Sequence, residues 1–123
     1  MHINQLIGFQ YIGSFLKSGN ETTLGKLHLD PVGKVFWALS VGSEVMYISY
    51  LDEERRLSER LHYIEYGNGK GTYNRIYNEI MKLPEETKVD IYIRKFDSII
   101  SADNRKSELD AKKNSYKKLP WDR

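Results

Sequence analysis

Apolar and polar residues follow a strand-like pattern through the first half of the chain. Aromatic residues fall at nearly alternate positions in Gly8–Lys17, which predicts an early strand. A short second strand is expected near Leu24–Leu29, before a proline and glycine break. Two further apolar runs, Val35–Leu39 and Val45–Ser49, flank turn residues at Gly42-Ser43. This arrangement predicts a β-hairpin.

The segment after the hairpin changes to the periodicity of a helix. Leu57, Leu61 and Ile64 recur at the spacing of one helical face and predict a buried stripe. Asp52 is expected to cap the start of this helix, because its carboxylate can accept hydrogen bonds from the first backbone amides. Gly67 is expected to end it.

The second half of the chain adds two helical segments and one strand. Ile76 and Ile80 mark a second amphipathic helix that should end at Pro84. Apolar residues alternate with polar ones over 89–93, which predicts a strand with one wet face. Residues 107–116 permit a helix with little amphipathic character. The whole order predicts an α+β fold, with helices that flank a small antiparallel-rich mixed sheet.

The length of 123 residues predicts a single domain spanning 1–123. We divide it into an N-terminal strand extension at 1–32, a core at 33–100, and a C-terminal helix and tail at 101–123. Cysteine is absent, which excludes disulfides and thiolate metal sites and favours the reducing cytoplasm. The first residues lack the pattern of a secretion signal, so a cytoplasmic protein is expected.

The charge balance gives little information about a partner. Nineteen Lys and Arg residues against seventeen Asp and Glu leave a net charge of +2, which does not demand a polyanionic ligand. The basic excess lies in the C-terminal segment 101–123. Function must therefore be inferred from particular residues.

The hairpin and the helix after it carry a spaced set of aromatic and basic residues. Trp37 and Tyr47 lie on the two predicted strands, and Arg60 follows on the helix within Leu57-x-x-Arg60-Leu61. This register resembles the GIY-YIG nuclease family, in which a GIY or GVY strand precedes a YIG strand and then a helix with an arginine. The resemblance implies a GIY-YIG-like fold.

Weaker matches to restriction-type members of that family extend over most of the chain. Gly8-Phe9-x-x-Ile12-Gly13 is similar to their first strand, and Thr72-Tyr73-Asn74-Arg75-Ile76 is similar to the start of a later helix. Near the end, Asp110-Ala111 resembles a Glu-Ala pair that the family carries on a helix, and Pro120-Trp121-Asp122 resembles the Pro-x-Trp-Asn segment that follows it.

The resemblance implies a DNA endonuclease that hydrolyses a phosphodiester with the help of Mg²⁺. It places Tyr47 and Arg60 at catalytic positions, where the planar guanidinium can hold a phosphate through two hydrogen bonds. Trp37 stands where the family has its first tyrosine, and Tyr50 could supply a second hydroxyl. Asp110 would be the metal carboxylate, since Mg²⁺ is often bound by one carboxylate and several waters.

A basic and polar set on the loop and second helix is expected to contact DNA. It consists of Lys70, Asn74, Arg75 and Lys82. Phosphate contacts from such side chains orient a nucleic acid without reading its sequence. The competing interpretation is that they form an ordinary solvated helix face.

Other functions remain open on the same residues. The indole of Trp37 cannot accept a proton, and Ser49 replaces the second glycine of the family pattern. A catalytically inactive domain that binds nucleic acid or a protein partner is therefore the alternative. Hydrolysis of a nucleotide or another small phosphorylated ligand would use the same groups. A homodimer is plausible, because restriction-like relatives often cut two strands as pairs.

Overall fold

The computed structural model describes residues 1–27, 29, 33–51, 56–67, 71–96, 105–116 and 118–122. Along these residues the short 3₁₀ helices η1 and η2 accompany strands β1–β5 and helices α1–α3. In chain order they are η1 (Ile3–Gln5), β1 (Gln10–Ser18), β2 (Glu21–Thr22), η2 (Thr23–Lys26), β3 (Val35–Val41), β4 (Glu44–Leu51), α1 (Leu57–Tyr66), α2 (Thr72–Met81), β5 (Lys88–Lys95) and α3 (Arg105–Ser115).

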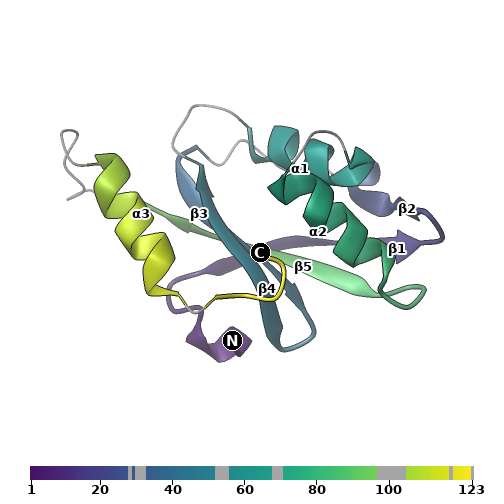
Figure 1. Cartoon of the computed structure of the whole chain (residues 1–123), viewed down its shortest axis with the longest axis horizontal. Coiled ribbons are helices and arrows are strands. Elements are labelled where there is room, and N and C mark those ends of the chain that lie inside the picture. Colours follow the sequence, from purple (N-terminus) through teal and green to yellow (C-terminus); the bar gives the residue numbers. More distant parts are fainter. Residues whose placement is uncertain are drawn as a thin grey trace.

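The strands form one curled sheet with the order β2-β1-β5-β3-β4 (Figure 1). Every pairing between these strands is antiparallel, so the sheet has no parallel component within the described residues. The α+β prediction is confirmed, and the sheet predicted to be antiparallel-rich is antiparallel in every described pairing. The strand β4 lies at one edge of the sheet.

The predicted hairpin is confirmed as β3 and β4. Gly42 adopts a left-handed φ of 59° in the turn, a conformation that glycine tolerates without a steric penalty. The register shifts between Leu39 and Ser40, because Leu39 pairs with Tyr47 and Ser40 pairs with Val45. Met46 is therefore the extra residue of a β-bulge on the edge strand.

The two helices after the hairpin also agree with the sequence pattern. In α1 the predicted stripe of Leu57, Leu61 and Ile64 is buried. Its N-cap is Arg56, which forms no side-chain capping bond, while Asp52 lies outside the described residues. Gly67 ends α1 with φ 60°, and a Cβ there would lie 2.8 Å from the Tyr77 ring of α2. Glycine thus permits both the chain reversal and the close approach of the two helices.

The predicted strand at Leu24–Leu29 is wrong. Residues Thr23–Lys26 form η2, and the second strand is the shorter β2 at Glu21–Thr22. The Thr22 hydroxyl accepts a hydrogen bond from the Leu24 amide, which caps the helical turn. Leu24 and Leu27 then reach the core with helical spacing, and this favours the turn over an extended strand.

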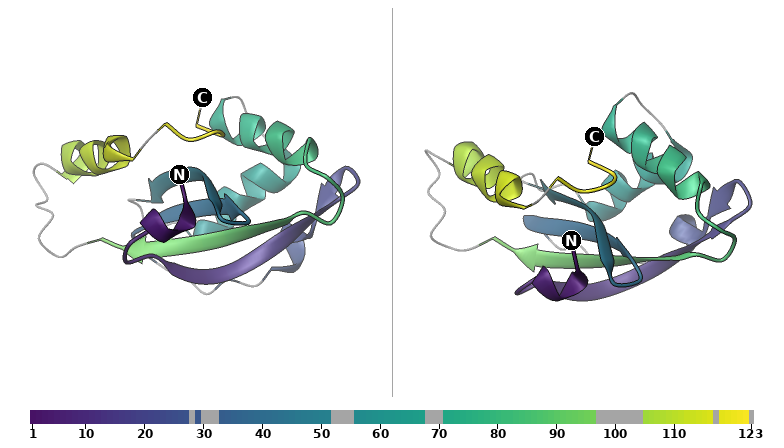
Figure 2. Two further views of the ribbon diagram at one scale, coloured as in Figure 1. Left: turned by 90° about the horizontal axis from the view of Figure 1, so that it is seen from below. Right: turned by 60° about the horizontal axis from the view of Figure 1, so that its bottom comes forward.

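Two apolar clusters lie on opposite faces of the β3-β4 hairpin. The larger cluster joins the sheet to α1 and α2 and includes Trp37 and Tyr47. The smaller cluster joins the hairpin to η1 and to Leu119 of the C-terminal segment. Figure 2 shows α1 and α2 above one end of the sheet, α3 beyond the other end, and the C-terminal segment between them. No helix among the described residues has both the length and the hydropathy needed to span a membrane.

Candidate functional site

Tyr47 lies on β4 within the larger cluster and is only 3% exposed. Cross-strand pairing places Tyr47 opposite Leu39, and places Ser49 opposite Trp37 on the same face. The Trp37 ring, 1% exposed, packs against the Tyr47 ring with 5.4 Å between their centroids. The structure therefore gives Trp37 a packing contact with Tyr47 in the core.

The surroundings of Tyr47 favour its protonated form. Burial raises the pKa of the Tyr47 hydroxyl to about 12, and a hydrogen bond with Ser49 opposes part of this rise. Tyr73 and Asp122 raise the same pKa by their charge, whereas Arg75 lowers it. The hydroxyl group thus lies within electrostatic reach of three side chains from α2 and the C-terminal segment.

Arg60 comes close to this group from α1. Its Nη1 atom donates a hydrogen bond to the Tyr73 hydroxyl at 3.4 Å, at the start of α2. Arg60 is half-buried and directly precedes Leu61 of the apolar stripe of its helix. A cationic fork and a tyrosine hydroxyl therefore lie together where the two helices meet.

The C-terminal segment supplies Asp122. The Trp121 side chain, 2% exposed, joins the larger cluster, and its backbone amide donates to the Met46 carbonyl at 3.0 Å. This bond uses a backbone acceptor of the edge strand at its bulge. It holds Asp122, the next residue, near Tyr47.

Tyr50 occupies the other face of β4, as the two-residue period of a strand requires. Its ring packs edge-on against Phe36 at 6.3 Å. Its hydroxyl donates to the Asp110 carboxylate on α3 at 2.5 Å. Tyr47 and Tyr50 thus have different partners, and Asp110 is hydrogen-bonded to Tyr50.

Helix α3 connects these two faces of the edge strand. One turn after Asp110, Lys113 places its Nζ atom over the Tyr47 ring, 5.9 Å from the centroid. Residues three apart in a helix share a face, so Asp110 and Lys113 both point toward β4. The ammonium group and the carboxylate are thereby brought to the same edge of the sheet.

Asp110 remains chemically suited to bind Mg²⁺. Its Oδ1 atom accepts the Tyr50 hydrogen bond, and its second oxygen is the atom that could ligate an ion. Among the described residues no group of three or more Asp, Glu, His or Cys side chains is arranged to hold a metal. One carboxylate with several waters is nevertheless a common set of Mg²⁺ ligands.

The predicted DNA-contacting residues do not all lie together. Arg75, in the first half of α2, lies within electrostatic reach of Tyr47. Asn74 is its half-buried neighbour. Lys82 lies beyond the far end of α2, where it forms an ion pair with Glu79 at 3.2 Å. Lys70 lies outside the described residues.

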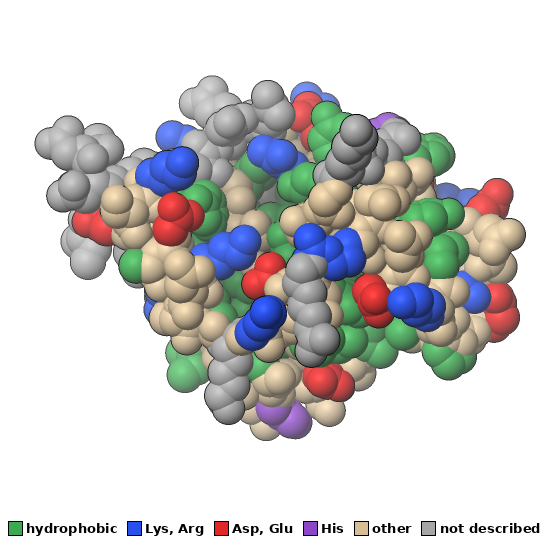
Figure 3. All heavy atoms as spheres, in the orientation of Figure 1, with side chains coloured by type: hydrophobic (Ala, Val, Ile, Leu, Met, Phe, Trp, Pro, Cys, Tyr) green, Lys and Arg blue, Asp and Glu red, His purple; other side chains and the backbone are tan. Residues whose placement is uncertain are grey.

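Charged side chains gather on one face of the molecule (Figure 3). Lys and Arg side chains gather in the centre of the view in Figure 3, between α3 and the α1-α2 pair, with acidic side chains among them. The C-terminal segment crosses the same region in Figure 1. We call the set Tyr47, Arg60, Tyr73, Arg75, Lys113 and Asp122 the edge-strand cluster.

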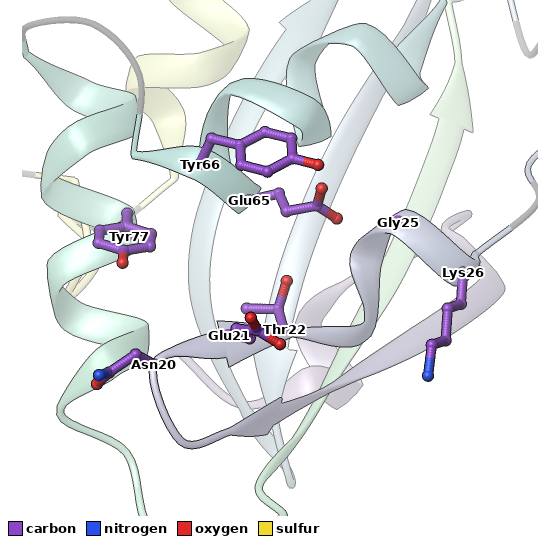
Figure 4. Close-up of a pocket in the computed structure, with 8 residues that line it drawn as sticks. All are labelled: Asn20, Glu21, Thr22, Gly25, Lys26, Glu65, Tyr66 and Tyr77. Atoms are coloured by element: carbon purple, nitrogen blue, oxygen red, sulfur yellow. The ribbon is translucent and has the colours of Figure 1, made fainter.

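A separate hollow of about 380 Å³ lies between the β2-η2 segment and the ends of α1 and α2. The side chains of Glu65 and Tyr66 point toward η2 in Figure 4, and Tyr77 faces the hollow from α2. A Cβ at Gly25 would lie 3.0 Å from a Glu65 oxygen, so the carboxylate closely approaches the η2 backbone. None of the residues predicted from sequence lines this hollow.

Four members of this neighbourhood were not among the candidates drawn from sequence. They are Ser49, Tyr73, Lys113 and Asp122. Ser49 lies two positions after Tyr47, and the strand period alone places it on the same face. The other three reach the site through the packing of α2, α3 and the C-terminal segment.

The comparison with known structures gives a likeness over the whole chain. A solved structure of a mutant of bacteriophage T4 EndoII is similar with a TM-score of 0.68 and 16% sequence identity, and the alignment covers 98% of each chain. No protein-family model and no curated protein matches the sequence. At this identity the likeness shows a shared fold.

Proposed function

We propose that this chain is an endonuclease that hydrolyses phosphodiester bonds in DNA with the help of Mg²⁺. The observation that carries the proposal is the edge-strand cluster, in which Tyr47, Arg60 and Arg75 come from different elements of a fold shared with a phage endonuclease. A shared fold alone does not define a function, so the argument depends on the chemistry of the cluster.

Arg60 is the residue proposed to hold the scissile phosphate. Its hydrogen bond to the Tyr73 hydroxyl fixes the guanidinium at the junction of α1 and α2. A guanidinium can donate two parallel hydrogen bonds to phosphate oxygens and neutralise charge that grows in the transition state. Arg75 and Lys113 add positive charge near Tyr47.

Tyr47 would act through its neutral hydroxyl. With a pKa of about 12, this hydroxyl keeps its proton at neutral pH. It can therefore orient a water molecule or a phosphate oxygen by hydrogen bonding, but it is a weak general base in the free protein. Its hydrogen bond with Ser49 and the packing of Trp37 would hold that orientation.

Asp110 would bind the metal ion, and Tyr50 would orient the carboxylate through its hydrogen bond. A bound Mg²⁺ would lower the pKa of a coordinated water and neutralise charge on the phosphate. The role of this chain is then to fix one carboxylate beside the basic groups of the edge-strand cluster.

Incubation of supercoiled plasmid with the protein and Mg²⁺ tests the proposal. We expect nicked and linear products, with a rate lower by about 10²–10³-fold in Arg60→Ala. Arg56→Ala is the matched control, because Arg56 is an exposed arginine at the start of the same helix. It should cut at close to the wild-type rate. No cutting by the wild-type chain, or equal rates for both variants, would contradict the proposal.

A binding domain without turnover is the second candidate. It is favoured by the burial of Trp37 at the position where a first tyrosine hydroxyl would be expected. Such a domain would bind DNA, RNA or a protein partner but would not cut in the plasmid assay. DNA affinity measured at two salt concentrations separates a nucleic acid from a protein partner, because phosphate contacts weaken as salt rises. Absent or salt-insensitive DNA binding would favour the protein partner.

A homodimer stays a prediction for either candidate. Two copies would let a small domain act on both strands of a duplex. The molar mass in solution, measured by light scattering with and without a DNA duplex, would test this prediction directly.

A further inference from the structure

Aromatic rings form a continuous row on the surface of α1 and the start of α2. His62 contacts Tyr66 edge-on at 4.6 Å and Tyr63 at 6.4 Å between ring centroids. Tyr63 stacks on Tyr73 at 5.8 Å with an interplanar angle of 30°. We call the set Tyr66, His62, Tyr63 and Tyr73 the aromatic row.

Much of this row faces solvent. Tyr63 is 40% exposed and Tyr66 is 59% exposed, and His62 is exposed between them. The stripe that α1 buries in the core consists of Leu57, Leu61 and Ile64, so the α1 rings of the row lie outside that stripe, whereas Tyr73 of α2 is partly buried against the core. Exposed rings in contact with one another offer flat apolar surface together with polar edges.

The row begins at the edge-strand cluster. Tyr73 is a member of both sets: its hydroxyl accepts the Arg60 hydrogen bond while its ring stacks on Tyr63. Arg75 follows two residues later on α2 and lies within electrostatic reach of Tyr47. A strand whose phosphate is held by Arg60 would therefore extend its neighbouring nucleotides over the row.

The charges beside the row indicate which part of a nucleic acid could lie there. Glu59 adjoins a hollow of about 500 Å³ that Ser58, His62 and Tyr63 also line. Glu65 lies next to Tyr66, and its side chain points toward η2 (Figure 4). These carboxylates repel phosphate, so a duplex with phosphates on its outside fits the row poorly. Bases without a pairing partner carry no charge and can stack on the rings.

We propose that the aromatic row binds unpaired bases of the DNA strand whose phosphate lies at Arg60. This deepens the proposed function, on which it rests, because it assigns the site a substrate with single-stranded or locally unpaired character. Stacking of bases on aromatic side chains tolerates any base, since every base has a flat face. The row would contribute affinity for such strands and little sequence preference.

Fluorescence anisotropy with a short labelled DNA single strand, without divalent metal, tests this proposal. Tyr66→Ala should weaken binding by about tenfold, the usual scale for loss of one stacked base. Tyr66→Phe should bind like the wild type, because it keeps the ring. Tyr11→Ala is the matched control, since Tyr11 is 49% exposed and lies on β1 outside the row.

Two further ligands separate stacking from phosphate contact. For a duplex of the same sequence, and for an abasic strand with the same phosphates, Tyr66→Ala should change the affinity less than about twofold. An equal loss for the normal and abasic strands would overturn the stacking assignment. The same holds if Tyr66→Ala leaves the affinity for the normal strand unchanged, or if the wild-type chain does not bind single strands.

This measurement can fail independently of the proposed function. A chain that cuts plasmid but shows no Tyr66-dependent strand binding would keep the endonuclease proposal and lose the aromatic row. A chain that binds unpaired strands through Tyr66 but never cuts would lose the endonuclease proposal alone. Circular dichroism of each variant would confirm that its fold is unchanged.

Discussion

Two tyrosines on the edge strand, three positions apart, occupy different environments. Tyr47 is buried in the larger cluster beside Trp37, and burial raises its pKa to about 12. Tyr50 is half-buried on the opposite face and donates its hydroxyl to Asp110 on α3. Their separation follows from the two-residue period of a strand. A site that uses both must therefore be joined around the edge of β4, and α3 and the C-terminal segment make that connection.

The largest expected contrast is in the free energy of unfolding. Tyr47→Ala removes a buried ring from the core and should cost about 3–5 kcal/mol. Tyr50→Ala removes a half-buried ring and one hydrogen bond, and should cost about 1–2 kcal/mol. Urea unfolding of both variants measures the difference. Equal losses would show that the two faces of β4 contribute alike.

Alkaline pH should test the burial of the Tyr47 hydroxyl. The folded pKa of Tyr47 is about 12 against an ordinary value of 10.0, so the unfolded chain loses this proton first. Stability should therefore fall as pH rises from about 10 to about 12, by about 2–3 kcal/mol from this group.

The comparison variant for that titration is Tyr47→Phe, which removes the ionisable hydroxyl. Unfolding curves at several pH values should show a smaller alkaline loss in Tyr47→Phe than in the wild type. A Tyr47→Phe curve that falls as steeply as the wild type would contradict the assigned cause.

The hydrogen bond between Tyr50 and Asp110 should have a moderate effect. Tyr50→Phe keeps the ring against Phe36 and removes only the donor to the carboxylate. The expected cost is about 1–2 kcal/mol, since the acceptor is a carboxylate. When Tyr50→Phe is made in a chain that already carries Asp110→Asn, it should lower the free energy of unfolding by less, because the acceptor has lost its charge. A double-mutant cycle with no coupling would mean that the bond is absent in solution.

The smallest stability effect is expected for two neighbouring lysines of α3. Lys113 lies over the Tyr47 ring and Lys112 over the Tyr116 ring, each at 5.9 Å from the centroid. Lys113→Gln and Lys112→Gln should each change the unfolding free energy by about 0.5 kcal/mol or less.

The two lysines should differ in DNA binding. A plot of the logarithm of DNA affinity against the logarithm of salt concentration has a negative slope when phosphates are contacted. If Lys113 contacts a phosphate beside Tyr47, Lys113→Gln should reduce the magnitude of this slope by about one. Lys112→Gln should leave that slope unchanged. Titrations at several salt concentrations compare the pair, and equal slopes for both variants would exclude Lys113 from the DNA contact.

Most of the fold could be predicted from the sequence because local pattern determines it. The hairpin followed from two apolar runs around a glycine turn, and β5 followed from alternation over 89–93. The stripe of α1 followed from helical spacing. The strand predicted at Leu24–Leu29 is wrong because a short apolar run does not distinguish a strand from a capped turn.

The candidate site was only partly predictable, because its assembly depends on contacts between distant segments. The motif spacing pointed to Tyr47 and Arg60, and the structure places both near Tyr73. Tyr73 itself depends on how α2 packs against α1. Asp122 depends on the bond between Trp121 and the bulged residue Met46, which no local pattern encodes.

The central claim is that the two faces of the edge strand act as one catalytic site. The rate of plasmid cutting in a double-mutant cycle of Tyr47→Phe and Asp110→Asn tests it most directly. Residues that act as a unit show strongly non-additive losses, so the double variant should be little slower than the slower single variant. The claim would be contradicted if the fold-loss in cutting rate of the double variant equalled the product of the fold-losses of the two single variants. It would also be contradicted if the wild-type chain did not cut.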